Sequence, residues 1–93
     1  LKAPEALEWG IVNRVVADDE VVSQATQLAE KFASGPTLAF GAVKSLLNGS
    51  FDQTLESQME LEARAIADLV VTEDGQEGIR AFVDKRKPEF KGR

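Results

Sequence analysis

The chain has 93 residues, 43% of them hydrophobic, and a formal net charge of −5, which bounds it to one domain with a single modest core. It contains no cysteine and no histidine, so disulfides, thiolate chemistry and the commonest general base and metal ligand are excluded. The acidic balance argues against general nucleic-acid binding, and no run approaches the ~18 apolar residues that a membrane span needs. We therefore expect no metal site, no nucleic-acid partner and no membrane partner. A cytoplasmic location fits the lack of cysteine.

The first predicted element is a short helix over residues 4–9. Pro4 suits the first helical position, and Gly10 stands where a helix-ending glycine belongs. The apolar, β-branched run of residues 11–16 is too short for a helix and is either one brief strand or an extended connector. Nothing else in the chain resembles a strand that could pair with it. Trp9 is expected to pack in a core rather than to stack on a ligand.

Three longer helices are predicted next. The first covers residues 18–33 and is broken by the serine, glycine and proline of residues 34–36. The second covers residues 36–49 and has a wide apolar arc, which is typical of a helix that touches more than one neighbour. The third begins at residue 50 or 52, reaches about residue 70, and carries a second, smaller apolar patch at Leu61.

The last predicted element is an amphipathic helix that begins at Thr72 or Asp74 and ends before Pro88. Glu77, three residues after Asp74, completes a capping-box pattern. Residues 85–87 are all basic and would fill its last turn, where the helix dipole favours cations. Its apolar residues share one face, which must be covered: Ile79, Phe82 and Val83. The predicted fold is therefore all-α, a small bundle of about four helices plus a short N-terminal helix, with at most one short strand near residues 11–16.

Two groups of charged side chains are candidates for a chemical role. Glu62 lies on an apolar stripe and is either an acid–base catalyst with a raised pKa or a structural residue, that is, an ion-pair partner of Lys44 or Arg64 or a helix-capping acceptor. The structural interpretation is favoured, because catalysis would need a second positioned group and none stands out. The second group is the set of basic residues at the end of the chain: Lys85, Arg86, Lys87, Lys91 and Arg93. These side chains could bind a phosphate beside the Phe82 ring, or they could belong to a solvated tail, and the residues alone favour the solvated tail.

Four segments taken in order resemble the carboxy-terminal part of the enoyl-CoA hydratase/isomerase (crotonase) family. They are APEALEWGIVNRVV, ASGPTLAFGAVK, LEARA and EGIRAFVDKRKPEFKG. Each is weak alone, but the ordered set is specific and spans nearly all of residues 1–93. The resemblance implies a C-terminal helical domain that covers an active site and packs against other subunits, in trimers that often pair into hexamers.

The resemblance also implies that the catalytic residues lie elsewhere. In the family, backbone N–H groups that stabilise a thioester enolate and the acid–base carboxylates belong to an amino-terminal spiral domain, upstream of the segments matched here. The start at Leu1 suggests a fragment, so we assign no catalytic residue and expect the chain alone to be inactive. We also expect it to form a dimer or a larger homo-oligomer.

The cofactor expectations follow from the same resemblance. It implies that an acyl-CoA thioester is the substrate of the parent protein and that no cofactor is tightly bound. By similarity, Lys85 would approach the adenosine 3′-phosphate of CoA bound to a neighbouring subunit, and Phe82 would approach its adenine. CoA binding by the isolated chain is expected to be weak or absent.

Two alternatives remain open at this stage. The chain could be a stand-alone helical protein-interaction module whose basic tail binds an acidic partner, or a small acyl-CoA-binding helical carrier. The carrier is less favoured because its basic residues are confined to one tail. The particular acyl-CoA, the reaction and the pathway do not follow from these residues.

Overall fold

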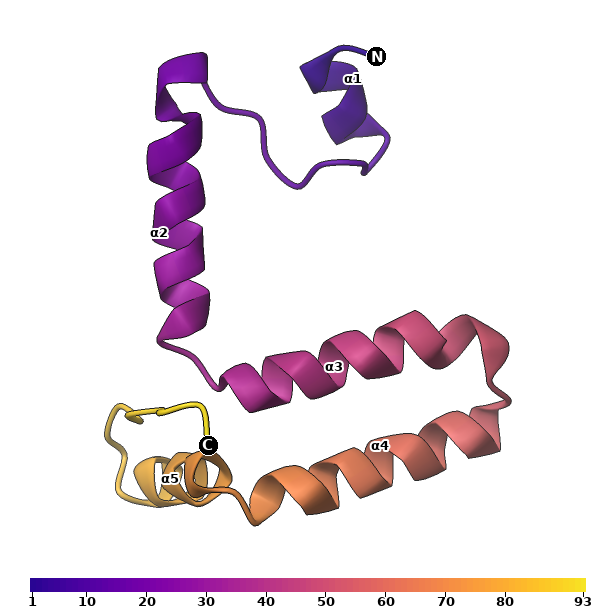
Figure 1. The fold of residues 1–93 in the computed structure, drawn as a ribbon, viewed down its shortest axis with the longest axis vertical. Coiled ribbons are helices and arrows are strands. Elements are labelled where there is room, and N and C mark those ends of the chain that lie inside the picture. Colours follow the sequence, from indigo (N-terminus) through magenta and orange to yellow (C-terminus); the bar gives the residue numbers. More distant parts are fainter. The chain divides into compact units, whose positions relative to one another are not determined.

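The computed structural model describes residues 1–93, and every regular element in it is helical (Figure 1). The helices are α1 (Ala3–Glu8), α2 (Val21–Ala33), α3 (Thr37–Gly49), α4 (Leu55–Val70) and α5 (Glu73–Val83), with short 3₁₀ turns at Asp18–Glu20 and Ser50–Asp52. The all-α prediction is confirmed. Residues 11–16 form no strand, so the connector is the correct alternative. None of the helices combines the length and apolar composition that crossing a membrane requires.

The chain divides into two compact units, Leu1–Glu30 and Lys31–Arg93. In the first unit, α1 ends at Gly10, whose φ of 73° is left-handed. The Gly10 N–H donates to the Leu7 carbonyl (3.0 Å) and the Ile11 N–H to the Ala6 carbonyl (2.9 Å). This pair of bonds is the glycine-dependent helix ending that the sequence predicts.

Packing inside the first unit is light. Ala6 is buried, whereas the Trp9 side chain is 65% exposed, so the prediction that Trp9 lies in a core is wrong for this chain. The six-residue helix α1 buries only the small side chain of Ala6, which is too little to form a core around an indole. Arg14 instead ties the connector to α2, because its Nη1 donates to Oε1 of Gln24 at 2.9 Å.

In the second unit, α3 and α4 run antiparallel and contact one another (Figure 1). The expected start of α4 at residue 50 or 52 is wrong. Residues 50–52 form a separate 3₁₀ turn, and Thr54 caps α4 because its Oγ1 accepts the Ser57 N–H at 3.2 Å. At the other end of α3, the Phe32 and Phe40 rings meet edge to face with centroids 5.7 Å apart, a favoured aromatic geometry.

The junction between α4 and α5 is tight. The Thr72 hydroxyl accepts the Gly75 N–H (3.0 Å) and donates to the Leu69 carbonyl (2.7 Å). Thr72 is therefore the cap, rather than Asp74. A Cβ on Gly75 would collide with the Leu69 carbonyl oxygen, so only glycine lets the two helix ends approach this closely.

The end of α5 differs from the prediction. The helix stops at Val83, well before Pro88, and residues 85–87 do not form its last turn. Lys85 has a φ of 53° and is the only non-glycine residue with positive φ. Its N–H donates to Phe82 (3.3 Å) and that of Arg86 to Ala81 (3.0 Å), so a lysine holds the position that glycine usually takes.

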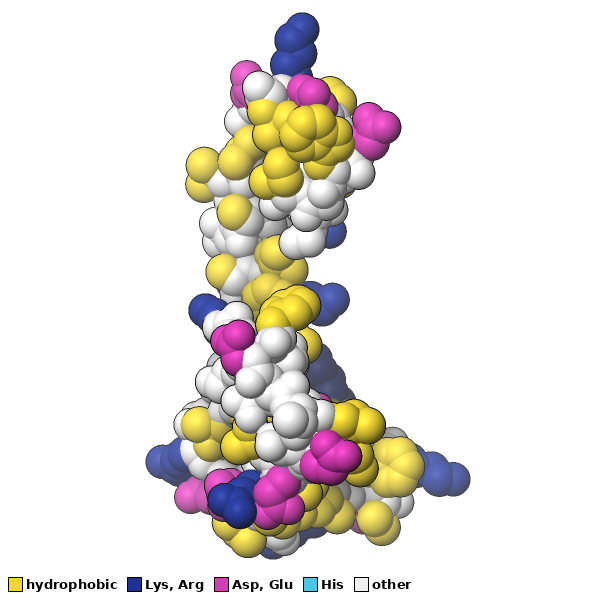
Figure 2. Space-filling view, turned by 90° about the vertical axis from the view of Figure 1, so that its right-hand side faces the viewer, with side chains coloured by type: hydrophobic (Ala, Val, Ile, Leu, Met, Phe, Trp, Pro, Cys, Tyr) yellow, Lys and Arg dark blue, Asp and Glu magenta, His cyan; other side chains and the backbone are white.

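Much of the apolar surface of these helices has no cover within the chain, and Figure 2 shows hydrophobic side chains across one face of the molecule. Ala6 and Ala81 are the only buried hydrophobic residues. The expected cover over the apolar face of α5 is absent, since Phe82 is 86% exposed and Val83 is also exposed. The opposite face of α5 is the covered one, and the chain that covers it is the tail, residues 84–93.

Candidate functional site

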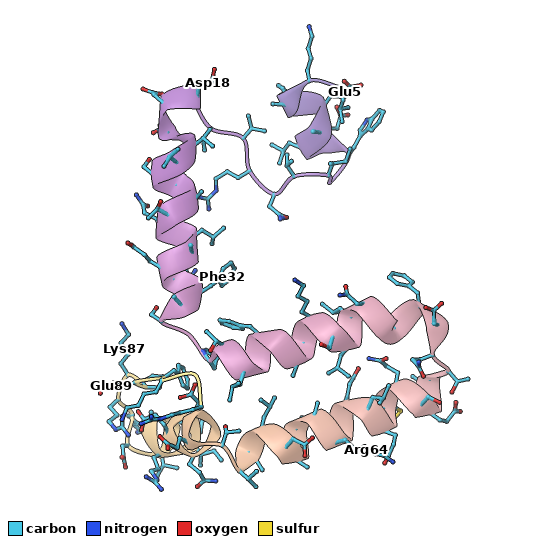
Figure 3. The ribbon with its side chains drawn as sticks, viewed as in Figure 1. Glu5, Asp18, Phe32, Arg64, Lys87 and Glu89 are labelled. Atoms are coloured by element: carbon cyan, nitrogen blue, oxygen red, sulfur yellow. The ribbon has the colours of Figure 1, made fainter.

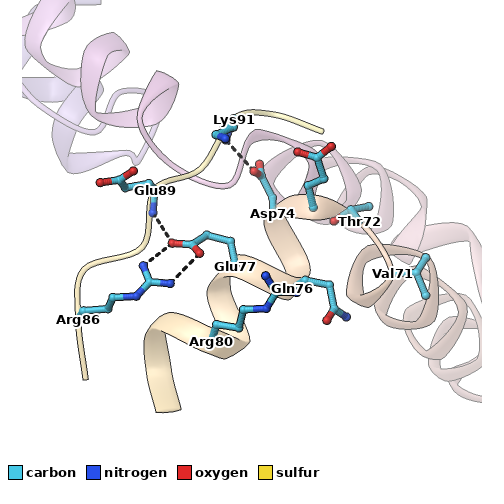
Figure 4. A pocket seen from close by; sticks show the side chains of 10 residues that line it. Val71, Thr72, Asp74, Gln76, Glu77, Arg80, Arg86, Glu89 and Lys91 are labelled. Atoms are coloured by element: carbon cyan, nitrogen blue, oxygen red, sulfur yellow. Dashed lines mark hydrogen bonds and ion pairs between the residues drawn. The ribbon is translucent and has the colours of Figure 1, made fainter. Parts of the chain in front are cut away.

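The tail folds back along α5 and is held by acidic side chains of that helix (Figure 4). Asp74, only 3% exposed, accepts the Lys91 N–H on Oδ1 (2.6 Å) and the Gly92 N–H on Oδ2 (2.8 Å). Its own N–H donates to the Arg93 carbonyl at 2.8 Å. One buried residue therefore bonds three consecutive residues at the end of the tail, and its negative charge suits the positive end of the helix.

A second anchor lies one turn further along α5. The Arg86 guanidinium donates to both oxygens of Glu77, Nη1 to Oε1 at 2.6 Å and Nη2 to Oε2 at 2.8 Å, and the Glu89 N–H donates to the same carboxylate at 2.9 Å. A two-pronged bond of this kind fixes direction as well as distance. The bond from Arg86, with a further contribution from the Glu89 N–H, lowers the pKa of the Glu77 carboxyl from 4.5 to about 2. The bond to Glu77 also raises the pKa of Arg86 above its usual range.

Apolar contacts complete the attachment of the tail. The Phe90 ring lies against Gly78 of α5, where a Cβ would be 3.6 Å from the ring. Phe90 lines a small hollow of about 280 Å³ together with apolar residues of three helices: Leu38, Ala39, Leu69 and Ile79. The tail therefore links α5 to the start of α3 and the end of α4.

A polar hollow of about 620 Å³ borders the two anchors (Figure 4). Three of its acidic lining residues bond the tail: Glu77 pairs with Arg86, Asp74 accepts the Lys91 N–H, and Glu73 pairs with Arg93, outside the hollow, at 3.0 Å. No group of three or more acidic side chains converges in a way that could hold a metal ion. Glu73, Asp74 and Glu77 are therefore taken up in holding the tail.

The basic cluster predicted from the sequence is divided by the fold. Arg86 and Arg93 are consumed by ion pairs with acidic residues of α5, whereas Lys85, Lys87 and Lys91 form no ion pair. The tail is therefore docked on α5 rather than free, although the Arg93 side chain stays 67% exposed.

The two residues expected at a CoA site stay at the surface. Phe82 lies on the last turn of α5 and Lys85 in the turn that follows, both exposed. Neither of them lines the two hollows described above. The tail anchors are on the other side of the helix, so these two side chains remain free.

Glu62 is exposed on α4 and accepts a hydrogen bond from Nε2 of Gln58 at 3.0 Å. Neither expected partner reaches it, because Arg64 bonds Glu60 instead (2.8 Å; Arg64 is labelled in Figure 3). The partners named from the sequence were wrong. A satisfied side chain on an exposed surface gives no sign of an acid–base role.

Sequence reasoning missed the two tail anchors. The sequence indicates Asp74 and Glu77 only as capping residues, because their spacing of three matches a capping pattern. Their partners lie 9 to 18 residues further along the chain. The signal that could have found them is the pairing of an acidic first half with a basic second half across a helix-ending turn.

Comparison with known proteins identifies the family of the chain. A family model described as enoyl-CoA hydratase/isomerase matches residues 1–93. The chain belongs to the enoyl-CoA hydratase/isomerase family. A protein of Rhizobium meliloti (strain 1021) named as a probable enoyl-CoA hydratase is 43% identical over 93 residues, covering 100% of this chain and 36% of that protein.

Other members of the family that resemble the chain carry different names. The 1,2-epoxyphenylacetyl-CoA isomerase of Escherichia coli (strain K12) is 37% identical over 93 residues, covering 100% of this chain and 36% of the relative. A crystal structure of an enoyl-CoA hydratase/isomerase from Mycobacterium abscessus has a TM-score of 0.94 at 38% identity, with 100% and 36% coverage. The chain thus spans about a third of the length of these family members.

Proposed function

We propose that this chain is the carboxy-terminal helical part of an enzyme that acts on acyl-CoA thioesters by enolate chemistry. The observation that carries this proposal is the family match over residues 1–93 together with a fold that closely follows that of a solved family member. In this proposal the catalytic groups belong to the remaining two thirds of the protein, and the chain alone has no activity. Relatives named as a hydratase and as an isomerase match similarly well, so we propose the substrate class rather than one reaction.

The role of the chain in this enzyme is to cover the active site and to pack against other subunits. Exposed apolar side chains support this role, since contiguous apolar surface on helices marks a binding face. On the second unit they include Phe51, which is 95% exposed, and also Leu47, Leu55, Met59 and Ile66. We propose that the enzyme assembles as trimers, or as hexamers built from two trimers, in which these apolar faces are buried between subunits.

The CoA contact that we propose involves Phe82 and Lys85. Both are exposed and both are left free by the tail anchors. In the assembled enzyme the Lys85 ammonium would pair with the adenosine 3′-phosphate of CoA bound to a neighbouring subunit, and the Phe82 ring would lie against the adenine. An exposed cation beside an exposed aromatic ring at a helix end is chemically suited to this nucleotide.

A chimeric enzyme tests the proposal directly. The matching third of the Rhizobium meliloti relative, 43% identical to this chain, is replaced by residues 1–93. Hydration of a short 2-enoyl-CoA is then followed by the loss of the absorbance of its conjugated thioester. We expect an active oligomer. The control is the same relative without that third, which we expect to be inactive.

The activities of the chimera and of the truncated control decide between two explanations of the chain. Activity in the chimera and none in the truncated control supports a structural and substrate-binding role in a CoA-thioester enzyme. A folded, oligomeric chimera with no activity on any acyl-CoA would contradict the proposal. In that case a non-catalytic interaction module becomes the better explanation of the exposed apolar faces.

A further inference from the structure

The turn that carries Lys85 is anchored on both of its sides. Before it, the Lys85 and Arg86 N–H groups bond the Phe82 and Ala81 carbonyls at 3.3 and 3.0 Å. After it, the Arg86 side chain and the Glu89 N–H are both held by the Glu77 carboxylate. These bonds span residues 81–89 and leave the Lys85 side chain itself without an ion-pair partner.

The conformation held in this way is an unfavourable one for lysine. Lys85 has a φ of 53°, in a region that residues with a Cβ adopt only at a cost. Glycine would take the same turn without that cost. Strain of this kind persists where the surroundings over-determine it and is a pointer to a functional side chain.

From this arrangement we infer that Glu77 and Arg86 are positioning residues: their two-pronged bond locks the left-handed turn and thereby aims the Lys85 ammonium at the phosphate of a CoA thioester. The inference rests on the proposed function, since it takes the CoA thioester as the ligand of Lys85. Glu77 and Arg86 themselves touch no ligand. Their effect is transmitted through the backbone between Val83 and Glu89.

Arg86 has a second, weaker acidic contact. Asp84 lies 3.6 Å from Nε of Arg86, on the other side of Lys85 in the sequence. Arg86 therefore contacts both acids at once. Without the Glu77 carboxylate only the longer contact to Asp84 would remain, and the Glu89 N–H would lose its acceptor, which would loosen the turn. The bond between Arg86 and Glu77, rather than the contact with Asp84, therefore decides how firmly Lys85 is presented.

The experiment uses the chimeric enzyme with the variants Glu77→Gln and Arg86→Lys, the second of which keeps the charge but loses the two-pronged geometry. Each is assayed with an enoyl-CoA and with the same thioester of 3′-dephospho-CoA. We expect KM for the CoA thioester to rise about fivefold, the size of one partly exposed ion pair, with kcat nearly unchanged. KM for the dephospho thioester should stay unchanged.

Lys85→Met should give the same pattern of KM changes, and adding Glu77→Gln to it should raise KM for the CoA thioester no further.

The matched control is Glu60→Gln, which breaks an exposed ion pair with Arg64 on α4 (2.8 Å) and should change neither KM. Equal losses on both thioesters would mean that the bond between Glu77 and Arg86 only stabilises the fold, and an unchanged KM for CoA would mean that it does not aim Lys85. Either result overturns the inference while the active chimera leaves the proposed function standing. An inactive parent chimera overturns both.

Discussion

At the scale of single residues, Lys85 is where local preference and observed structure disagree. Its left-handed backbone costs a residue with a Cβ about 1–2 kcal/mol. The gain from the bonds around it is spread over several neighbours, so replacing the side chain alone does not release the turn. Mutation of Lys85 can therefore measure the cost of its positive φ without removing the hydrogen bonds that hold the turn.

We expect Lys85→Gly to raise the free energy of unfolding by about 1 kcal/mol, because glycine accepts positive φ without strain. Lys85→Ala keeps a Cβ in the same conformation and should leave stability within about 0.5 kcal/mol of the original. Urea denaturation of the three proteins measures both differences. A destabilised glycine variant would show that the turn is not strained.

The Glu77 carboxyl makes a prediction about pH. Its pKa is lowered to about 2 in the folded chain, so its bonds stabilise the fold above the ordinary pKa of 4.5 and are lost as the pH falls through about 2. The difference in urea midpoint between the original chain and Glu77→Gln should therefore be constant from about pH 8 to pH 5 and shrink between about pH 4.5 and pH 2. A difference that grows as the solution is acidified would contradict this assignment.

At the scale of elements, the sequence is informative where a single residue type decides the outcome. Gly10 ends α1 as predicted, and Thr72 begins α5 as one of two predicted caps. The end of α5 was misplaced because Pro88 and the basic run of residues 85–87 both suggested a later stop. The true stop depends on Lys85 adopting a conformation that lysine rarely takes, which no local pattern reveals.

The same limit explains the missed anchors. Asp74 lies in the first turn of α5, where acids are common, and Glu77 follows it at capping-box spacing. Their local pattern therefore has a sufficient local explanation. Their actual partners, Arg86 and the backbone of residues 89–92, become neighbours only after the tail reverses. Because Phe82 and Val83 lie on the opposite face, the sequence pattern drew attention to the side of α5 that the chain leaves open.

Two glycines in helices should respond oppositely to the same change. Gly75→Ala places a Cβ against the Leu69 carbonyl, and overpacking of this kind costs about 1–3 kcal/mol. Gly41→Ala, inside α3, meets nothing within 4 Å and should stabilise by about 0.5–1 kcal/mol through helix propensity. Thermal unfolding of the two variants checks the sign. A stable Gly75→Ala variant would mean that α4 and α5 separate easily.

At the scale of the whole molecule, the dominant feature is apolar surface that the chain itself does not cover. The buried hydrophobic residues are both alanines, whereas Phe51, Leu55 and Phe82 are largely exposed. Burial of such surface gains about 25 cal/mol of free energy per Å², which strongly favours association. The pattern is typical of a part that is completed by other protein surfaces.

We therefore expect residues 1–93 alone to form a dimer or a larger assembly in solution. Sedimentation velocity over a range of concentrations measures this, and Phe51→Ser with Leu55→Ser should shift the distribution toward smaller species, since Phe51 is 95% exposed and Leu55 72% exposed. Arg64→Ser, a change on the same helix that removes an exposed charged side chain, is the control. A strict monomer at high concentration would contradict the expectation.

The bond between the Asp74 N–H and the Arg93 carbonyl, joined by the ion pair of Glu73 with Arg93, closes residues 73–93 into a ring without a covalent link. A protease that cuts the exposed peptide between Lys85 and Arg86 would therefore open the ring at one point while Asp74 and Glu77 keep both pieces in place. The nicked chain would separate on a denaturing gel and remain whole on a native column. The cut would free Lys85 from the positive φ that the intact chain imposes on it, while the rest of the chain would stay folded.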